Sequence, residues 1–415
     1  MAVALGAVSP SRGGGGAPRP PLPPPNPPAG AVRSARTPPR HRRAPRPRRA
    51  GGAALVLLAG LAVVAGVLSA RGPLASDRAA GAPVAGTVGR AVPARFTVGL
   101  ALCSFVERTA TPTYDYVTRT SSDVRVLETE IRYPTLNGAA STETRAARPA
   151  LRDGPYPVIV FAHGYAVTPD TYQPLLDTWV RAGFVVVAPL FPNTNHVAVN
   201  KAIAATPGSN PELDLPNQPG DLAYLTRQVA AGARAGLSTC RVLRGLVDPA
   251  EIGLAGQSDG AETVGALAYD GQDAGLRAGL HYAADVVMSG QELAGAYSAS
   301  PGDPPLLVIQ SATDECNPPQ GSTTLYNDVR QPDKWFLEIL HAPHLGPYDD
   351  GDPDSFPTVA QVTTRFFQLE LRAKTPAAGF LSFGNRWPSV ARISTGPSAP
   401  ALPRLPDSIA ACYAG

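Results

Sequence analysis

The sequence predicts an α/β fold with a mostly parallel central sheet and helices on both of its faces. Six short, largely apolar runs recur between residues 158 and 340, and segments with helical spacing of apolar residues lie between them. Strands that are apolar throughout are typical of a parallel sheet, because helices cover both faces of such a sheet. Polar residues suited to catalysis directly follow several of these runs, and functional residues gather at the carboxyl ends of parallel strands.

Eight strands and five helices are expected along the chain. Residues 114–118 and 124–133 are expected strands, and the second alternates polar and apolar residues as half-buried antiparallel edge strands do. The six apolar runs predict strands over residues 158–162, 185–188, 252–255, 285–288, 306–309 and 335–340. The segments between and after them predict helices over residues 172–182, 219–236, 261–269, 322–329 and 358–373. Together they predict one α/β domain over residues 93–375, followed by a Pro- and Ser-rich tail over residues 376–415.

The amino-terminal segment is not typical of a folded domain. Residues 1–50 contain ten arginines, no Asp or Glu and a Pro-rich run, a composition that predicts a disordered leader. Residues 51–70 carry no charge and have about the length needed to span a bilayer. Arginines before this apolar segment predict that the chain after it is exported, through either a signal anchor or a cleaved signal peptide. Residues 71–92, rich in Ala, Gly and Val, are interpreted as a linker.

The distribution of charge argues against a nucleic-acid partner. The formal net charge is +3, but ten of the 36 basic residues lie within residues 1–50. The remainder has 26 basic and 33 acidic residues, a difference of −7, so the exported part is mildly acidic. The arginines are explained by the orientation of the leader in the membrane. Residues 51–70 would be the contact with a membrane if they are not cleaved.

The cysteines predict disulfides. Four are present, Cys103, Cys240, Cys316 and Cys412, and an even number in an exported chain predicts two bonds with three possible pairings. A bond between Cys316 and Cys412 would pin the tail, and free thiols are the alternative.

The chain is organised around residues 256–260, which read Gly-Gln-Ser-Asp-Gly between an apolar run and a helix-like segment. A strand, a sharp turn and a helix form the context in which Gly-x-Ser-x-Gly marks a nucleophile. The serine stands in a strained turn, and side chains at the flanking glycines would collide with the neighbouring strand and helix. Ser258 is therefore the predicted nucleophile.

An acid and a histidine follow later strands, in that order. A serine hydroxyl needs an imidazole to accept its proton, and a carboxylate on the other imidazole nitrogen fixes the tautomer. Asp314, which follows the run 306–309, is the predicted acid. Two histidines compete for the role of base. His341 abuts the last apolar run, whereas His344 lies three residues into the loop, where the chain can reach back over the sheet, and His344 is preferred.

Two backbone N–H groups are expected to form an oxyanion hole. One belongs to Asp259, directly after the nucleophile, and the other to Tyr165, which follows His163 and Gly164. The Tyr165 ring would form an aromatic wall of the acyl pocket, with a core tyrosine as the alternative. His163 is expected to order the loop behind the oxyanion hole, and the other histidines outside the leader, His196 and His281, are expected to be structural or exposed.

Two features could suggest a metal site, and neither fits one. Residues 348–354 are acidic, but the twelfth position counted from Asp349 is Ala360, so the helix-loop-helix calcium pattern fails. His341 and His344 lack further His or Cys residues at zinc-ligand spacing. No metal and no organic cofactor is expected.

Four stretches resemble the serine α/β-hydrolases: residues 161–165 (Phe-Ala-His-Gly-Tyr), 256–260, 312–314 (Ala-Thr-Asp) and 341–345 (His-Ala-Pro-His-Leu). The resemblance covers approximately residues 95–370 and is nearest to the exported dienelactone-hydrolase, chlorophyllase, platelet-activating-factor acetylhydrolase and bacterial cutinase group. In those families the histidine stands in a stretch like Gly-Ala-x-His, which supports His344. Gln257 and Asp259 depart from the His or Tyr and the apolar or basic residue usual around the nucleophile.

The sequence and this resemblance together imply an exported or membrane-anchored serine hydrolase. It would cleave carboxylic esters through a Ser258–His344–Asp314 triad and an acyl-enzyme intermediate, with a small-molecule, lipid or polyester ester as substrate. One alternative is an exported acyltransferase that uses the same triad. Another is a catalytically inactive envelope binding module, which predicts a misplaced triad.

Overall fold

The computed structural model describes residues 96–136, 142–235, 240–269, 277–291, 302–373 and 379–406. The expected leader, apolar segment and linker over residues 1–92 lie outside the described residues, as does Cys412. Within the described ranges, no helix is both long and apolar enough to cross a membrane.

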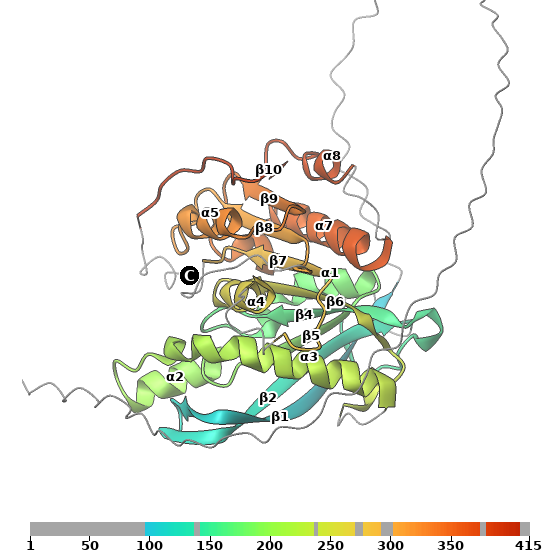
Figure 1. The fold of residues 1–415 in the computed structure, drawn as a ribbon, viewed down its shortest axis with the longest axis vertical. Coiled ribbons are helices and arrows are strands. Elements are labelled where there is room, and N and C mark those ends of the chain that lie inside the picture. Colours follow the sequence, from blue (N-terminus) through green and yellow to red (C-terminus); the bar gives the residue numbers. More distant parts are fainter. Residues whose placement is uncertain are drawn as a thin grey trace, which may run out of the picture. The chain divides into compact units, whose positions relative to one another are not determined.

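A ten-stranded sheet runs through the described part of the chain in the order β10-β9-β8-β7-β6-β4-β5-β2-β1-β3 (Figure 1). The six strands from β9 to β5 in this order are parallel. The pairs β5–β2, β2–β1 and β9–β10 are antiparallel, and the short β3 pairs parallel with β1. The strands are β1 (Thr97–Asp115), β2 (Thr120–Thr135), β3 (Thr144–Arg145), β4 (Tyr156–Ala162), β5 (Val185–Leu190), β6 (Val247–Gln257), β7 (Ala284–Met288), β8 (Leu306–Ser311), β9 (Lys334–Ile339) and β10 (Ala391–Thr395). The predicted mostly parallel sheet is thus confirmed, and all six apolar runs are strands.

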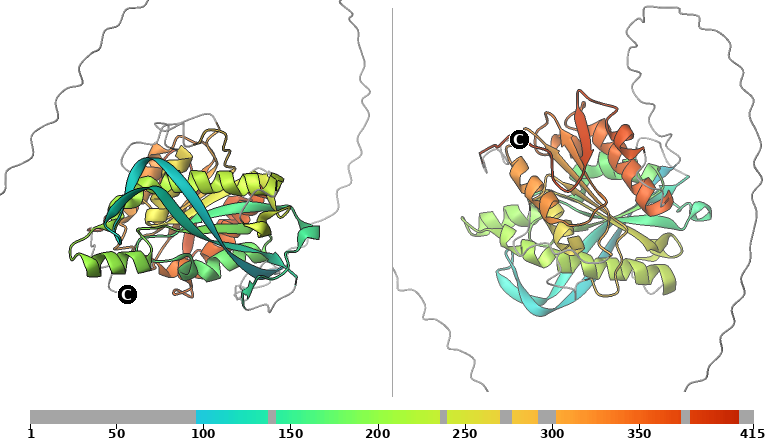
Figure 2. Two further views of the ribbon diagram at one scale, coloured as in Figure 1. Left: turned by 90° about the horizontal axis from the view of Figure 1, so that it is seen from below. Right: turned by 45° about the horizontal axis from the view of Figure 1, so that its top comes forward.

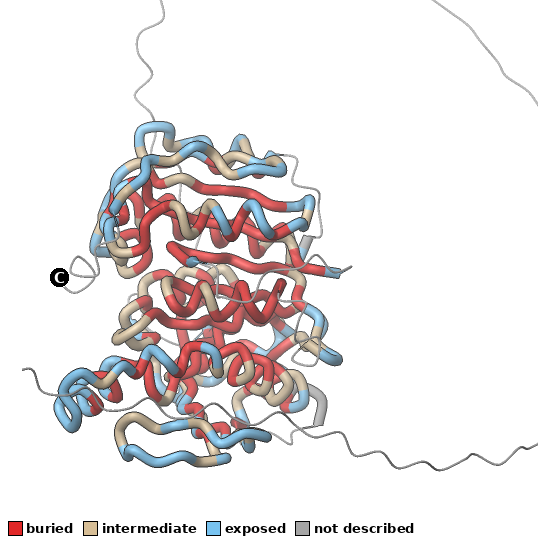
Figure 3. The backbone as a smooth tube through the Cα atoms, turned by 60° about the vertical axis from the view of Figure 1, so that its left-hand side comes forward, coloured by how far each residue is buried: buried red, intermediate tan, exposed pale blue. Residues whose placement is uncertain are grey.

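Helices cover both faces of this sheet. They are α1 (Gln173–Arg181), α2 (His196–Ala205), α3 (Gln218–Ala235), α4 (Asp259–Tyr269), α5 (Pro319–Asp328), α6 (Gly346–Asp349), α7 (Phe356–Phe367) and α8 (Phe380–Gly384). Apolar residues of α3, α4 and α5 belong to one core cluster, and those of α1, α6, α7 and α8 belong to another. β4 serves both, because Val158 and Val160 pack in the first cluster and Ile159 and Phe161 in the second. Figure 3 shows the buried backbone concentrated in these central elements.

The antiparallel side of the sheet is larger than expected. β1 has 19 residues and pairs with the 16 residues of β2, which Figure 2 shows as a long, twisted pair of strands. Only residues 114 and 115 of the expected strand at 114–118 belong to β1, because β1 begins at Thr97 and residues 116–119 form the turn of the hairpin. Backbone pairing with β2, interrupted between Arg108 and Thr113, rather than burial holds the outer part of β1, where many side chains are exposed.

Two kinds of contact fasten this hairpin to the rest of the domain. Cys103 in β1 forms a disulfide with Cys240, across a sequence separation of 137. Arg125 in β2 donates from Nη2 to the carboxylates of Asp214 (2.8 Å) and Asp221 (2.6 Å), and all three side chains are buried. Buried carboxylates of this kind depend on their cation, because they are removed from water.

The sheet extends into the residues that the sequence assigned to a tail. β10, within residues 376–415, pairs antiparallel with β9 and becomes the outer strand on that side. Its pattern is weak, because only Ala391 and Ile393 are buried among its five residues. α2, which follows β5, was also not expected, and the helix predicted to Ala373 changes from α to π geometry at Gln368.

Candidate active site

Ser258 stands in the sharp turn between β6 and α4. Its φ is +56°, a left-handed conformation that non-glycine residues seldom adopt. A Cβ on Gly256 would lie 2.1 Å from the carbonyl oxygen of Gly260, and a Cβ on Gly260 would lie 2.1 Å from the carbonyl oxygen of Ala162. Both flanking positions therefore require glycine, because the colliding atoms belong to the backbone. The turn has the strained strand–turn–helix form expected around a nucleophile.

Asp314 and His344 meet at the same edge of the sheet. Asp314 follows β8 and is fully buried, and His344 follows β9 and is partly exposed. The Nδ1 atom of His344 lies 2.8 Å from Oδ2 of Asp314. The other carboxylate oxygen, Oδ1, accepts the backbone N–H groups of Cys316 (3.0 Å) and Asn317 (2.9 Å). A carboxylate held in this way can fix the tautomer of an imidazole.

The three predicted triad residues thus follow the carboxyl ends of β6, β8 and β9 in the parallel part of the sheet. Within the described residues, the Ser258 hydroxyl and the His344 imidazole are not hydrogen-bonded to each other. Oγ of Ser258 instead lies 3.4 Å from Nδ2 of Asn317. The rejected candidate His341 is exposed, although it is only three residues from His344.

The loop after β4 lies against Ser258. A Cβ on Gly164 would be 3.2 Å from Cβ of Ser258, so the backbone next to Tyr165 passes close to the serine. His163 orders this loop, because its Nε2 accepts the N–H of Phe191 (3.1 Å) and its Nδ1–H donates to the carbonyl of Gly164 (2.7 Å). Burial lowers the pKa of His163 to about 4, so the ring is neutral and its two contacts agree with a single tautomer.

A family model described as Chlorophyllase matches residues 124–208. The matched stretch runs from β2 to α2 and includes the loop with His163, Gly164 and Tyr165, whereas Ser258, Asp314 and His344 lie outside it. This match agrees with the sheet order and with the turn at Ser258. The chain has the α/β-hydrolase fold. Its predicted resemblance to the group that includes the chlorophyllases is confirmed. No curated protein matches the chain.

In this α/β-hydrolase fold, the residue after Ser258 is a buried acid. Asp259 is 7% exposed, and its Oδ2 has no hydrogen-bond partner among the described residues. Burial, and then the charge of Glu212, raise the pKa of Asp259 from 3.8 to about 7. Burial, and then the charges of Asp259 and Glu212, raise the pKa of Glu262 to about 8. The first turn of α4 therefore holds two carboxyl groups that take up protons near neutral pH.

Three residues near the candidate triad were given no role by the sequence. Nε2 of Gln257 lies 3.0 Å from Nε2 of His344, and Oε1 of Gln257 accepts the hydroxyl of Tyr172 at 2.7 Å. The side-chain amide of Asn317 donates to the hydroxyl of Ser258, and its backbone N–H donates to the carboxylate of Asp314. The unusual Gln257 before the nucleophile was the one signal that could have pointed to this network. The oxyanion roles of Tyr165 and Asp259 stay predictions.

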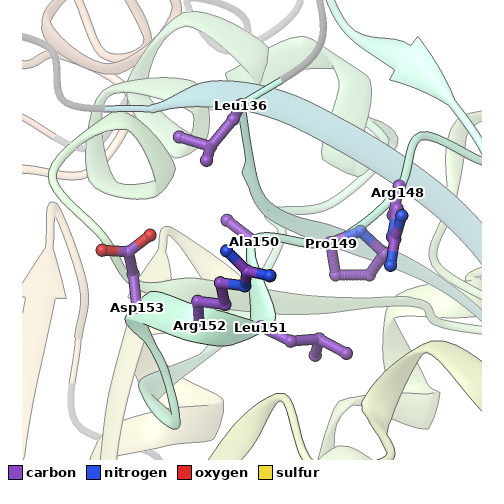
Figure 4. A pocket seen from close by; sticks show the side chains of 7 residues that line it. All are labelled: Leu136, Arg148, Pro149, Ala150, Leu151, Arg152 and Asp153. Atoms are coloured by element: carbon purple, nitrogen blue, oxygen red, sulfur yellow. The ribbon is translucent and has the colours of Figure 1, made fainter.

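A cavity of about 300 Å³ lies away from these residues (Figure 4). Leu136 and residues 148–153 line it, and they precede the start of β4. It therefore lies toward the amino ends of the parallel strands, opposite the edge that carries Ser258. Among the described residues, no group of His, Cys, Asp or Glu is arranged to hold a metal ion.

The structure shows one of the disulfides that the sequence left open. The Cys103–Cys240 bond is present, and Cys316 is also disulfide-bonded. The pairing of Cys316 with Cys412 stays a prediction, because Cys412 lies outside the described residues.

Proposed function

We propose that this protein is a serine hydrolase that cleaves carboxylic esters with Ser258, His344 and Asp314. The observation that carries the proposal is a serine at φ +56° between β6 and α4, at the same sheet edge as an imidazole 2.8 Å from a buried carboxylate. A nucleophile, a base and an orienting acid in this arrangement serve acyl transfer. The match to the chlorophyllase family model supports a hydrolase of this class.

In the proposed reaction, Nε2 of His344 accepts the proton of the Ser258 hydroxyl as Oγ attacks the ester carbonyl carbon. The N–H groups of Asp259 and Tyr165 would bind the resulting oxyanion, and the start of α4 favours negative charge there. Collapse of this intermediate breaks the bond to the alcohol, which leaves with the proton from His344. Water then attacks the acyl-enzyme by the same steps, which releases the acid and restores Ser258. The steps use no metal and no organic cofactor.

The proposed place of action is outside the cytoplasm, with the domain secreted or anchored through residues 51–70. The disulfide between Cys103 and Cys240 supports this proposal, because such bonds persist mainly in oxidising compartments. Protease treatment of intact cells that express the full chain tests it. Digestion of the domain on intact cells, or its recovery from the medium, is expected, and protection until the cells are lysed would refute export.

Hydrolysis of p-nitrophenyl esters with acyl chains of two to twelve carbons tests the activity. Ser258→Ala and His344→Ala should each lower kcat by about 10⁴- to 10⁶-fold, because the triad acts as a unit. His341→Ala is the matched control, since this exposed histidine lies in the same loop, and it should keep wild-type activity. Full activity in His344→Ala would show that another residue is the base. A folded wild-type protein that cleaves no ester would refute the hydrolase and favour a transferase or a binding module.

A further inference from the structure

Ser258 and His344, the proposed nucleophile and base, are each hydrogen-bonded to a side-chain amide. Asn317 reaches the Ser258 hydroxyl at 3.4 Å, a long contact, whereas Gln257 reaches Nε2 of His344 at 3.0 Å. Nε2 is the nitrogen that must accept the serine proton. In the structure, Nε2 of His344 is therefore hydrogen-bonded to Gln257 and not to Ser258.

The direction of this contact follows from its neighbours. The carboxylate of Asp314 accepts a hydrogen bond, so Nδ1 of His344 is the donor. In the tautomer that this bond fixes, Nε2 is the acceptor. The Tyr172 oxygen accepts the N–H of Gly164 at 3.1 Å, and its own hydroxyl proton is then donated to Oε1 of Gln257 at 2.7 Å. The amide of Gln257 must therefore present its NH₂ group to His344.

Burial makes this network specific. Gln257 is 1% exposed and Tyr172 is fully buried, so water does not compete for their polar atoms. The network joins Gly164, in the loop beside the proposed oxyanion hole, to the base through two side chains. The amide nitrogen of Gln257 also lies 3.4 Å from the backbone carbonyl oxygen of His344, a longer contact than the one to Nε2.

We propose that Gln257 is a positioning residue that holds His344 in a resting orientation, with the proton-accepting lone pair of Nε2 occupied. Tyr172 fixes the amide of Gln257 in this role. Proton transfer from Ser258 begins when the imidazole exchanges its bond to Gln257 for one to the serine hydroxyl. This inference rests on the proposed function, because it assigns Ser258 and His344 as nucleophile and base. It concerns the reactivity of the Ser258 hydroxyl, which can be measured without an ester substrate.

The rate at which a fluorophosphonate phosphonylates Ser258 in the full-length protein is the first test. In that reaction Oγ bonds to phosphorus, fluoride leaves, and His344 takes the hydroxyl proton. Gln257→Met keeps the length of the side chain and removes the donor. It should raise the rate at saturating reagent by about 2- to 10-fold, the range that one neutral hydrogen bond supports. An unchanged or slower rate in the folded variant overturns the proposal.

The matched control lies on α2. Nδ2 of Asn200 is 3.0 Å from Nε2 of His196, which is the same kind of amide–imidazole contact at an exposed site. Asn200→Met should leave the phosphonylation rate at the wild-type value. A rise as large as that in Gln257→Met would show that the effect does not come from His344, and would overturn the proposal.

A spectroscopic readout keeps the inference separate from ester turnover. In ¹⁵N-histidine-labelled protein, the resonance of His344 Nε2 is identified by its loss in His344→Ala. Gln257→Met should move it toward that of a nitrogen without a hydrogen bond, and an unmoved resonance overturns the proposal. If the wild-type protein cleaves no ester, but Gln257→Met still shows this shift and the faster phosphonylation relative to wild type, the proposed function is refuted and the inference is supported.

Tyr172→Phe supplies a second variant, which also serves if Gln257→Met does not fold. It retains the amide but removes the hydroxyl that orients it, so the phosphonylation rate should rise by less than in Gln257→Met. In the double variant the two effects should not multiply, because both act on one contact. Effects that multiply fully would mean that the two side chains act independently, and would overturn the role given to Tyr172.

Discussion

Asp259 predicts an unusual loss of stability as the pH rises. The folded protein raises the pKa of this carboxyl from 3.8 to about 7, chiefly because the group is buried beside the nucleophile. The folded state therefore binds the Asp259 proton more tightly than the unfolded state does. The stabilising effect of this proton is complete below pH 3.8, decreases as the pH rises, and stops changing above about pH 7. Asp259→Asn removes this dependence, because an amide does not titrate.

The magnitude follows from the size of the pKa change. Each unit of difference between the two states corresponds to about 1.4 kcal/mol, so between pH 5 and pH 8 the wild-type protein should lose about 3 kcal/mol relative to Asp259→Asn. The neighbouring Glu262 adds to the difference in the same direction, because Asp259 helps to raise its pKa. In the active site, an ionised Asp259 would also oppose the oxyanion, so the kcat of the wild type should fall relative to the variant over this range.

Urea unfolding at pH 5, 6, 7 and 8 measures this difference directly. Asp354→Asn is the control, because Asp354 is an exposed carboxylate away from the candidate site, and its curve should run parallel to that of the wild type. If the wild-type and Asp259→Asn free energies of unfolding stay parallel within about 0.5 kcal/mol, Asp259 does not titrate as described and the reasoning is refuted.

Two further substitutions test the turn at the nucleophile and the buried ion pairs. Gly260→Ala should lower the free energy of unfolding by about 1–3 kcal/mol, because its Cβ would meet the Ala162 carbonyl at 2.1 Å; an unchanged melting temperature would contradict this. Arg125→Met should cost about 3–5 kcal/mol in urea unfolding, because it leaves the carboxylates of Asp214 and Asp221 buried without their cation. A loss below about 1 kcal/mol would show that those carboxylates find other partners.

The exposed pair Arg108–Asp123 supplies the control for the second of these. Its side chains are 75% and 58% exposed, and surface pairs contribute about 0–1 kcal/mol. Arg108→Met should therefore change the free energy of unfolding by less than about 1 kcal/mol.

The parts of the candidate site that could be predicted are those encoded locally. Each of the three predicted triad residues follows an apolar run: Ser258, Asp314 and His344. The carboxyl ends of parallel strands lie at one edge of the sheet, so the strand prediction alone brings these residues together. The choice of His344 over His341 needed only the reach of the loop and the resemblance to known stretches. The structure places His344 on Asp314 and leaves His341 exposed.

The parts that could not be predicted depend on side-chain orientation across long sequence distances. Gln257 meets His344 across 87 positions and Tyr172 across 85, and no periodic pattern encodes such contacts. β10 was missed because a five-residue strand with two buried side chains has almost no alternation to detect. Residues 97–113 of β1 were missed because most of this stretch has exposed or half-buried side chains and is held by pairing with β2, which the composition of one strand does not show.

The disulfide between Cys103 and Cys240 makes a covalent ring of the chain between them. Both sides of any peptide bond in that span remain joined through sulfur after the bond is cut. A protease that nicks one of the loops in this span would therefore release no fragment until a reductant is added. The strands β2, β4 and β5, with the loop at Gly164, would stay attached to the part of the chain that carries Ser258.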